Sequence, residues 1–144
     1  MKKMMMFLAA SAVLFAVACD KDDDVRPVDQ LDAATLEAVM NLYPSGNVVD
    51  VDVYQDFIEV EVMDGLTSHD VYFDKQGNWL RTETDVRVAD LPSAVTSAIA
   101  ASEHAALHID DAEWVETPDG NYYVIELDAN PDVYLTITAE GVIL

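Results

Sequence analysis

The spacing of apolar residues changes along the first half of the chain. Between residues 29 and 43 the apolar side chains recur at i, i+3, i+4 and i+7, which predicts an amphipathic helix with Asp29 or Asp32 as its cap. Pro44 and Gly46 then end the helix. After that point apolar and polar residues alternate, as is typical of half-buried strands. The helix stripe is Leu36, Val39, Met40 and Tyr43, and strands are expected near 49–54, 58–62, 69–73 and 78–84.

The same order of patterns starts again at residue 90. "DLPSAVTSAIAASEHA" predicts a second helix with Asp90 as the candidate cap and Pro92 in its first turn. Its apolar residues are spaced four apart: Leu91, Val95 and Ile99. "MDGL", "DKQG", "TPDGN" and "DANPD" hold the Asp, Asn, Gly and Pro residues that favour turns. Strands are expected near 111–116, 122–128 and 133–138, with a short one at 142–144.

The two halves also correspond in sequence. "VYFDKQGNWL" aligns without gaps on "LTITAEGVIL", and "FIEVEV" matches "YVIEL" at nearly the same offset. We therefore predict a tandem repeat of one helix plus three to four antiparallel strands, with repeat one over 29–88 and repeat two over 89–144. Because one unit buries little alone, the expected fold class is α+β, with a shared antiparallel sheet and both helices on one face.

The amino end predicts export. Lys2 and Lys3 precede an apolar stretch over 4–18, which is too short to span a bilayer and suits a signal peptide. Small residues then precede Cys19, the only cysteine of the chain. This segment resembles a bacterial lipoprotein signal, and the resemblance implies lipidation of Cys19. An ordinary signal peptide is the alternative, but it would leave a free thiol in an exported protein. Residues 1–18 are then a lipoprotein signal peptide, and 19–28 hold the lipidated cysteine and an acidic tether.

The charge balance limits the class of partner. The chain has 7 basic and 28 acidic residues, a formal net charge of −21. Cleavage after residue 18 would remove Lys2 and Lys3 but no acid, which takes the net charge to −23. Such a field opposes nucleic acid and anionic lipid faces, and favours basic partners or cations. Solubility alone is the simpler explanation of the charge.

No residue pattern points to catalysis. His104 and His108 are four apart but lack the glutamate of a zinc-binding HExxH helix, and His69 lies in the other repeat. The aspartate-rich pieces lack the spacing of a calcium loop. No serine lies in a G-x-S-x-G turn, and no glycine-rich phosphate loop is present. We expect no enzyme activity, no cofactor and no dedicated metal site.

The remaining candidate is a surface. If the helices cover one face of the sheet, the other face meets solvent, and tyrosine suits binding faces because it combines rigid apolar area with a polar tip. Exposed strands favour tyrosine in any case, so the alternative is plain sheet propensity. Trp79 and Trp114 are expected in core or sheet-edge packing. The alternation groups these candidate partner-binding residues: Tyr54, Glu59, Glu61, Tyr72, Tyr122, Glu126 and Tyr134.

The phrases "YFDKQGNWLRTE" and "DLPSAVTSAI" resemble the PepSY-like, β-lactamase-inhibitor-like family of exported proteins in Bacteroidetes-type bacteria. The resemblance covers residues 29–144, although the second repeat departs from it at "EHAALH" and "TAEGVIL". It implies repeated helix-plus-strand units and a non-catalytic character. The amino end resembles a lipoprotein signal, and the acids after Cys19 resemble a surface-export signal, with a flexible spacer as the alternative.

These observations favour a non-catalytic module that is exported, lipid-anchored to the outer membrane through Cys19 and exposed in the envelope or at the cell surface. It is expected to contact a protein or peptide and no nucleic acid. Two alternatives stay open at this point. One is an inhibitor of an exported hydrolase, such as a protease or a β-lactamase-like enzyme, and the other is an acidic cation-binding protein.

Overall fold

The computed structural model describes residues 26–144. They form one seven-stranded sheet in which every neighbouring pair is antiparallel and the strands follow chain order. Two α-helices accompany the sheet, which confirms the α+β class. The elements are η1 (Pro27–Gln30), α1 (Ala33–Leu42), β1 (Asn47–Val53), β2 (Phe57–Asp64), β3 (Thr67–Asp74), β4 (Trp79–Asp85), η2 (Val88–Asp90), α2 (Ser93–Ala101), β5 (Ile109–Thr117), β6 (Gly120–Leu127) and β7 (Val133–Ile137).

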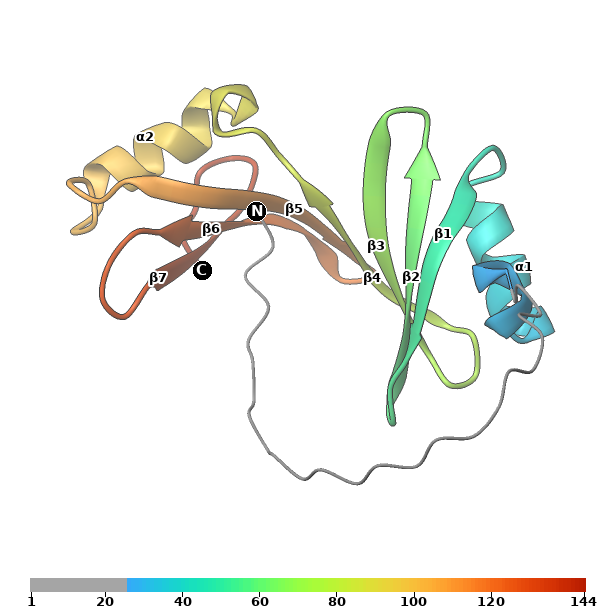
Figure 1. The fold of residues 1–144 in the computed structure, drawn as a ribbon. Coiled ribbons are helices and arrows are strands. Elements are labelled where there is room, and N and C mark those ends of the chain that lie inside the picture. Colours follow the sequence, from blue (N-terminus) through green and yellow to red (C-terminus); the bar gives the residue numbers. More distant parts are fainter. Residues whose placement is uncertain (1–25) are drawn as a thin grey trace, which may run out of the picture.

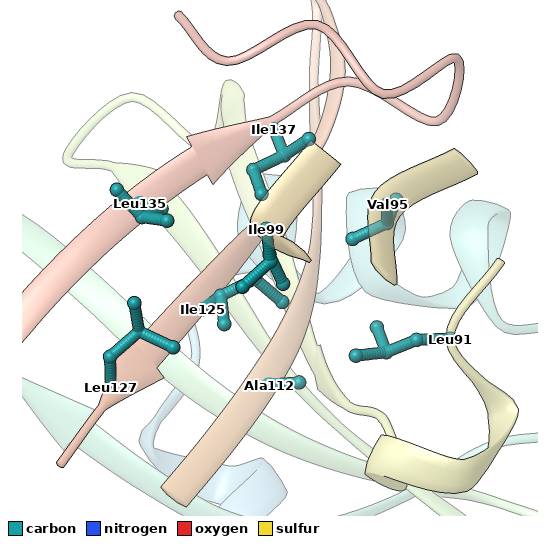
Figure 2. Packing of buried hydrophobic residues seen from close by; sticks show 8 residues of the cluster. All are labelled: Leu91, Val95, Ile99, Ala112, Ile125, Leu127, Leu135 and Ile137. Atoms are coloured by element: carbon teal, nitrogen blue, oxygen red, sulfur yellow. The ribbon is translucent and has the colours of Figure 1, made fainter. Parts of the chain in front are cut away.

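The two helices lie at opposite ends of the sheet, α1 beside β1 and α2 beside β5 to β7 (Figure 1). Each helix has its own hydrophobic core. Val39 of α1 packs with residues of β1 to β3, including Val60 and Phe73, which are fully buried. The predicted stripe of Leu91, Val95 and Ile99 packs on β5 to β7 (Figure 2). The buried residues of this second core are Leu91, Val95, Ile99, Ala112, Ile125, Leu127, Leu135 and Ile137.

The caps of the two helices differ. Asp32 is the cap of α1, because its Oδ1 accepts a hydrogen bond from the backbone N–H of Thr35 at 2.8 Å. The prediction of Asp90 as the cap of α2 is wrong. Asp90 ends the 3-10 helix η2 and pairs with Arg87, so the chain has already turned before α2 begins. Pro92 is the N-cap there and makes no side-chain hydrogen bond.

The turn predictions at the hairpins hold. Asp64 and Thr67 pair across the β2–β3 turn, where Gly65 has a φ of 63°. The β3–β4 turn is closed by a hydrogen bond from the Gly77 N–H to the Asp74 carbonyl at 3.0 Å. The short strand expected at 142–144 is wrong: the strand pairing found there is an isolated bridge between Ile137 and Ile143.

Some expected core positions are exposed. Val49 sits at the irregularity between Val48 and Asp50 in β1, and 43% of its surface is accessible. Val53 of β1 and Met40 of α1 also face solvent, so the buried side of β1 and the buried stripe of α1 hold fewer residues than the sequence predicts. Pro27–Gln30 form η1 where a linker was expected. Within residues 26–144, neither helix is long and apolar enough to cross a bilayer.

Candidate functional site

Cross-strand pairing defines one continuous polar face of the sheet. Paired residues of antiparallel strands point to the same side, so the series Asp50–Glu61–Asp70–Glu83 crosses β1 to β4 on one side. In every strand except β4 these residues alternate with members of the two hydrophobic cores. In β4 the buried residue on the other side is Thr82, and on the acidic face Val115 is itself buried. We call this side the acidic face. It comprises Asp50, Asp52, Phe57, Glu59, Glu61, Asp70, Tyr72, Arg81, Glu83, Asp85, Asp111, Glu113, Val115, Tyr122, Val124, Glu126, Tyr134 and Thr136.

Carboxylates oppose one another directly on the acidic face. Like charges at opposed positions destabilise a sheet, yet this arrangement recurs from one edge strand towards the other. The opposed acidic pairs are Asp52 with Glu59, Asp50 with Glu61, Glu61 with Asp70, Asp70 with Glu83, Asp85 with Glu113, and Asp111 with Glu126. Local sequence choices that oppose stability are expected at functional sites.

One guanidinium lies within this field. The Cζ of Arg81 is 3.7 Å from the centre of the Tyr72 ring, and its Nε donates to the Glu83 Oε1 at 2.6 Å. Tyr72 is 8% exposed and also contacts Phe57, with ring centres 5.8 Å apart. Burial, followed by the charges of Glu83 and Glu59, raises the pKa of the Tyr72 hydroxyl. Tyr72 therefore stays neutral and serves as a platform for Arg81.

The other half of the acidic face has a hollow in place of such a pair. The hollow is shallow and open to solvent, with a volume of about 40 Å³, and the residues that line it come from β5, β6 and β7. Tyr134 stands at its rim with 62% of its surface exposed. The lining residues are Asp111, Ala112, Glu113, Val124, Glu126 and Tyr134.

Glu113 is the titratable group most affected by this environment. Burial raises its pKa to about 7, and the charges of neighbouring carboxylates act in the same direction. Those neighbours come from three strands and are Glu83, Asp111, Asp85 and Asp70. Burial and the charge of Glu126 also raise the pKa of the Tyr134 hydroxyl. Ionisation of Glu113 in the hollow therefore costs free energy, because the carboxylate is partly buried and lies near other negative charges.

The structure places most of the sequence-predicted residues on one side of the sheet. Glu59, Glu61, Tyr72, Tyr122, Glu126 and Tyr134 all lie on the acidic face. Tyr54 lies in the β1–β2 turn, outside the strands, and stacks on Phe57 with ring centres 4.5 Å apart. Sequence reasoning missed Arg81, Glu83 and Glu113. Alternation from Tyr122 through the β5–β6 turn could have located Glu113, whereas the register shift between β3 and β4 hides the positions of Arg81 and Glu83.

The tryptophans and histidines lie elsewhere. Trp79 packs against the α1 core, and its Nε1 donates to the Thr82 Oγ1 at 3.0 Å. Trp114 packs against Tyr123, with ring centres 4.6 Å apart. His69 stacks on Tyr43, with ring centres 4.8 Å apart. In the part of the chain that the structure describes, no three histidine, cysteine, aspartate or glutamate side chains form a group suited to a metal ion.

Comparison with known proteins identifies the family. Residues 56–144 match the family described as "Putative beta-lactamase-inhibitor-like, PepSY-like". The chain belongs to this family. The match covers more than half of the chain, and it confirms the resemblance carried by "YFDKQGNWLRTE" and "DLPSAVTSAI". Among curated proteins, none matches the chain.

Solved structures of Bacteroides proteins share the fold of this PepSY-like chain. A BLIP-like protein from Bacteroides fragilis is 25% identical, with a TM-score of 0.73 over 78% of this chain and 82% of that one. A DUF2874 family protein from Bacteroides uniformis is 23% identical, with a TM-score of 0.72 over 79% and 86% of the two chains. A protein of Bacteroides eggerthii, described as a "putative periplasmic" protein, is 21% identical, with a TM-score of 0.66 over 78% and 85%.

Proposed function

We propose that this PepSY-like chain is a non-catalytic binding module whose acidic face contacts a protein or peptide. One observation carries the proposal: carboxylates oppose one another across adjacent strands of a single face. In the isolated protein this arrangement only lowers stability. A partner that neutralises the charges would recover that free energy on binding. The tyrosines of the face add rigid apolar contact area.

An inhibitor of an exported hydrolase is the second candidate. The fold similarity to a BLIP-like protein, and the family description, favour it. Both candidates use a protein partner, but an inhibitor must also abolish an activity. If the immobilised chain captures a hydrolase, adding the chain to that enzyme should abolish its activity at equal molar amounts if the chain is an inhibitor. Retention with full activity would exclude this candidate. The cation-binding alternative has no group of three close ligands among residues 26–144 to support it.

We further propose that the module is exported and held at the outer membrane by lipid on Cys19, at the cell surface if the acidic tether acts as an export signal. Cys19 and most of the tether lie outside the described residues. The support is the sequence of the amino end and the description of a structural neighbour as periplasmic. Labelling of cells with a tagged fatty acid should mark the wild type and leave Cys19→Ala unmarked. Equal labelling of both proteins would refute the anchor.

The proposed tandem repeat has support in matched local geometry. Each α-helix follows a 3-10 helix, and the arginine directly before that 3-10 helix pairs with the aspartate three residues later. The distances are 2.9 Å for Arg26 and Asp29 and 2.6 Å for Arg87 and Asp90. Each first strand then has an irregularity that is followed by an aspartate whose Oδ1 accepts from the next backbone N–H. These hydrogen bonds join Val51 to Asp50 and Ala112 to Asp111.

The pairing register also supports two helices on one face. Val71 of the α1 core lies opposite Thr82, which lies opposite Glu116. Ala112, a member of the α2 core, and Glu116 are four residues apart on β5, and the irregularity of β5 does not lie between them. Residues an even number apart on a strand share a side, so both cores belong on the side opposite the acidic face.

A comparison of variants tests the binding face. The full chain would be immobilised as bait for envelope and secreted proteins of the cell that makes it. The face variant Glu126→Gln/Tyr134→Ser removes one charge and one exposed ring. The control variant Glu37→Gln/Met40→Ser removes one charge and one exposed apolar side chain on α1. A protein kept by the wild type and the control, but lost by the face variant, supports the proposal, and equal retention by all three refutes it.

A further inference from the structure

We infer that the partner presents a cationic segment, and that one of its arginine or lysine side chains occupies the hollow between β5, β6 and β7. This inference rests on the proposed function, because it names the chemistry of the partner for the same face. It is carried by the charge of the face, by the way in which the chain holds its own Arg81, and by the hollow itself.

The charge of the acidic face is almost entirely of one sign. Arg81 is the only basic residue among the strand residues that share this face. Opposed carboxylates on neighbouring strands repel one another, and a positively charged chain laid across them would remove that repulsion. The acids follow one another from strand to strand, so an extended segment with several cationic side chains fits the face better than a single small ion.

Arg81 shows how this face holds a guanidinium. The cation lies 3.7 Å from the centre of the Tyr72 ring, and Glu83 accepts its Nε–H at 2.6 Å. An aromatic ring and a carboxylate together satisfy both the flat face and the N–H edge of the guanidinium. In β3 and β4 the chain therefore supplies its own occupant for such a site.

The hollow offers the same two groups without an occupant from the described chain. Tyr134 provides a ring at the rim, and Glu126 lies directly opposite it in the register. Glu113 and Asp111 supply further carboxylates, while Val124 gives apolar contact for the methylene stem of a long side chain. The repulsion that raises the pKa of Glu113 would be relieved by a cation at this position.

Binding of an oligo-arginine peptide to the full chain tests the inference. The face variant Glu113→Gln/Glu126→Gln and the control Glu37→Gln/Glu140→Gln carry the same formal net charge, and the control positions are exposed outside the acidic face. We expect the face variant to bind at least tenfold more weakly than the wild type, and the control to change affinity less than threefold. Thermal melting would verify that both variants fold.

Proton release provides an independent readout. A cation beside Glu113 lowers the pKa of that carboxyl, so binding near pH 6.5 should release protons from the wild type and fewer from Glu113→Gln. Calorimetry in buffers of different ionisation enthalpy measures this release. Equal weakening of both double variants, or equal proton release from the wild type and Glu113→Gln, would reduce the binding to general attraction between opposite charges and overturn the inference.

Failure of the inference and failure of the proposed function are distinguishable. If oligo-arginine does not bind, the cationic partner is refuted. A natural protein retained by the wild type and lost by Glu126→Gln/Tyr134→Ser would then still support a binding face, with a partner of different chemistry.

Discussion

The guanidinium of Arg81 lies over the ring of Tyr72, with 3.7 Å between its Cζ and the ring centre. The two residues face each other across β3 and β4, and Glu83 completes the arrangement two positions along β4. This contact is the point at which the acidic face satisfies part of its own charge. Loss of Arg81 would remove the one basic side chain among the strand residues of this face.

Arg81→Gln should therefore destabilise the protein by about 1–2 kcal/mol, through loss of the cation–π contact and of the ion pair. The figure is kept low because the side chain of Arg81 is 39% exposed and solvent screens the pair. Chemical denaturation would measure the change. Arg87→Gln is the control, since its pair with Asp90 is largely exposed and should matter little. Equal effects of the two substitutions would contradict the role given to Tyr72.

Two turn glycines contact the first turns of the two helices. A Cβ on Gly77 would lie 3.0 Å from the backbone of Ala34 and Thr35, and one on Gly141 would lie 2.6 Å from the Ala94 carbonyl oxygen. Both glycines also have positive φ, 81° and 87°. Gly77→Ala and Gly141→Ala should each cost about 2–4 kcal/mol, because left-handed strain and a clash with the helix add up.

Gly65→Ala separates these two effects. Gly65 has a φ of 63°, but a Cβ at this position would have no neighbouring atom within 4 Å, so only the backbone strain should remain, about 1 kcal/mol. Urea denaturation of the three variants would rank them. A loss at Gly65 as large as that at Gly77 or Gly141 would show that helix contact plays no part.

The raised pKa of Glu113 makes stability depend on pH. The folded chain holds this proton up to a pH of about 7, while the unfolded chain releases it near the ordinary value of 4.5. The contribution of Glu113 to the free energy of unfolding is therefore largest below about pH 4.5, and it is lost as the pH rises towards 7. Glu113→Gln should stabilise the protein by about 1 kcal/mol more at pH 8 than at pH 5, after allowance for partial solvation.

Thermal melting of the wild type and Glu113→Gln at the two pH values measures this difference. Glu37→Gln controls for the general reduction of negative charge, because Glu37 is exposed on α1. A difference between wild type and Glu113→Gln that does not change with pH would mean that Glu113 titrates like an exposed carboxyl.

The fold was largely predictable because its patterns are local. The helix stripe of Leu91, Val95 and Ile99 is buried as expected, and the Asp-Gly turn at Gly65 has its expected place. The cap of α2 was not predictable from Asp90, because the intervening 3-10 helix uses that aspartate in a pair with Arg87. Exposure of Val49 depends on an irregularity in β1 that no alternation pattern reveals.

The candidate site was only partly predictable. Alternation grouped Glu59, Glu126 and Tyr134 correctly on one side of their strands. The placement of Arg81 over Tyr72, and the hollow beside Glu113, depend on the register between strands and on which strands are neighbours. Neither quantity is encoded within a single strand, so both needed the three-dimensional structure.

Site-specific photo-crosslinking in the intact envelope tests the central claim most directly. A photoreactive phenylalanine would replace Tyr134 on the acidic face in one protein and Glu37 on α1 in another. The account predicts a discrete crosslinked protein from position 134 and none from position 37, with the adduct reduced by Glu113→Gln/Glu126→Gln. The same adduct from both positions, or an adduct from position 37 alone, would contradict a binding role for the acidic face.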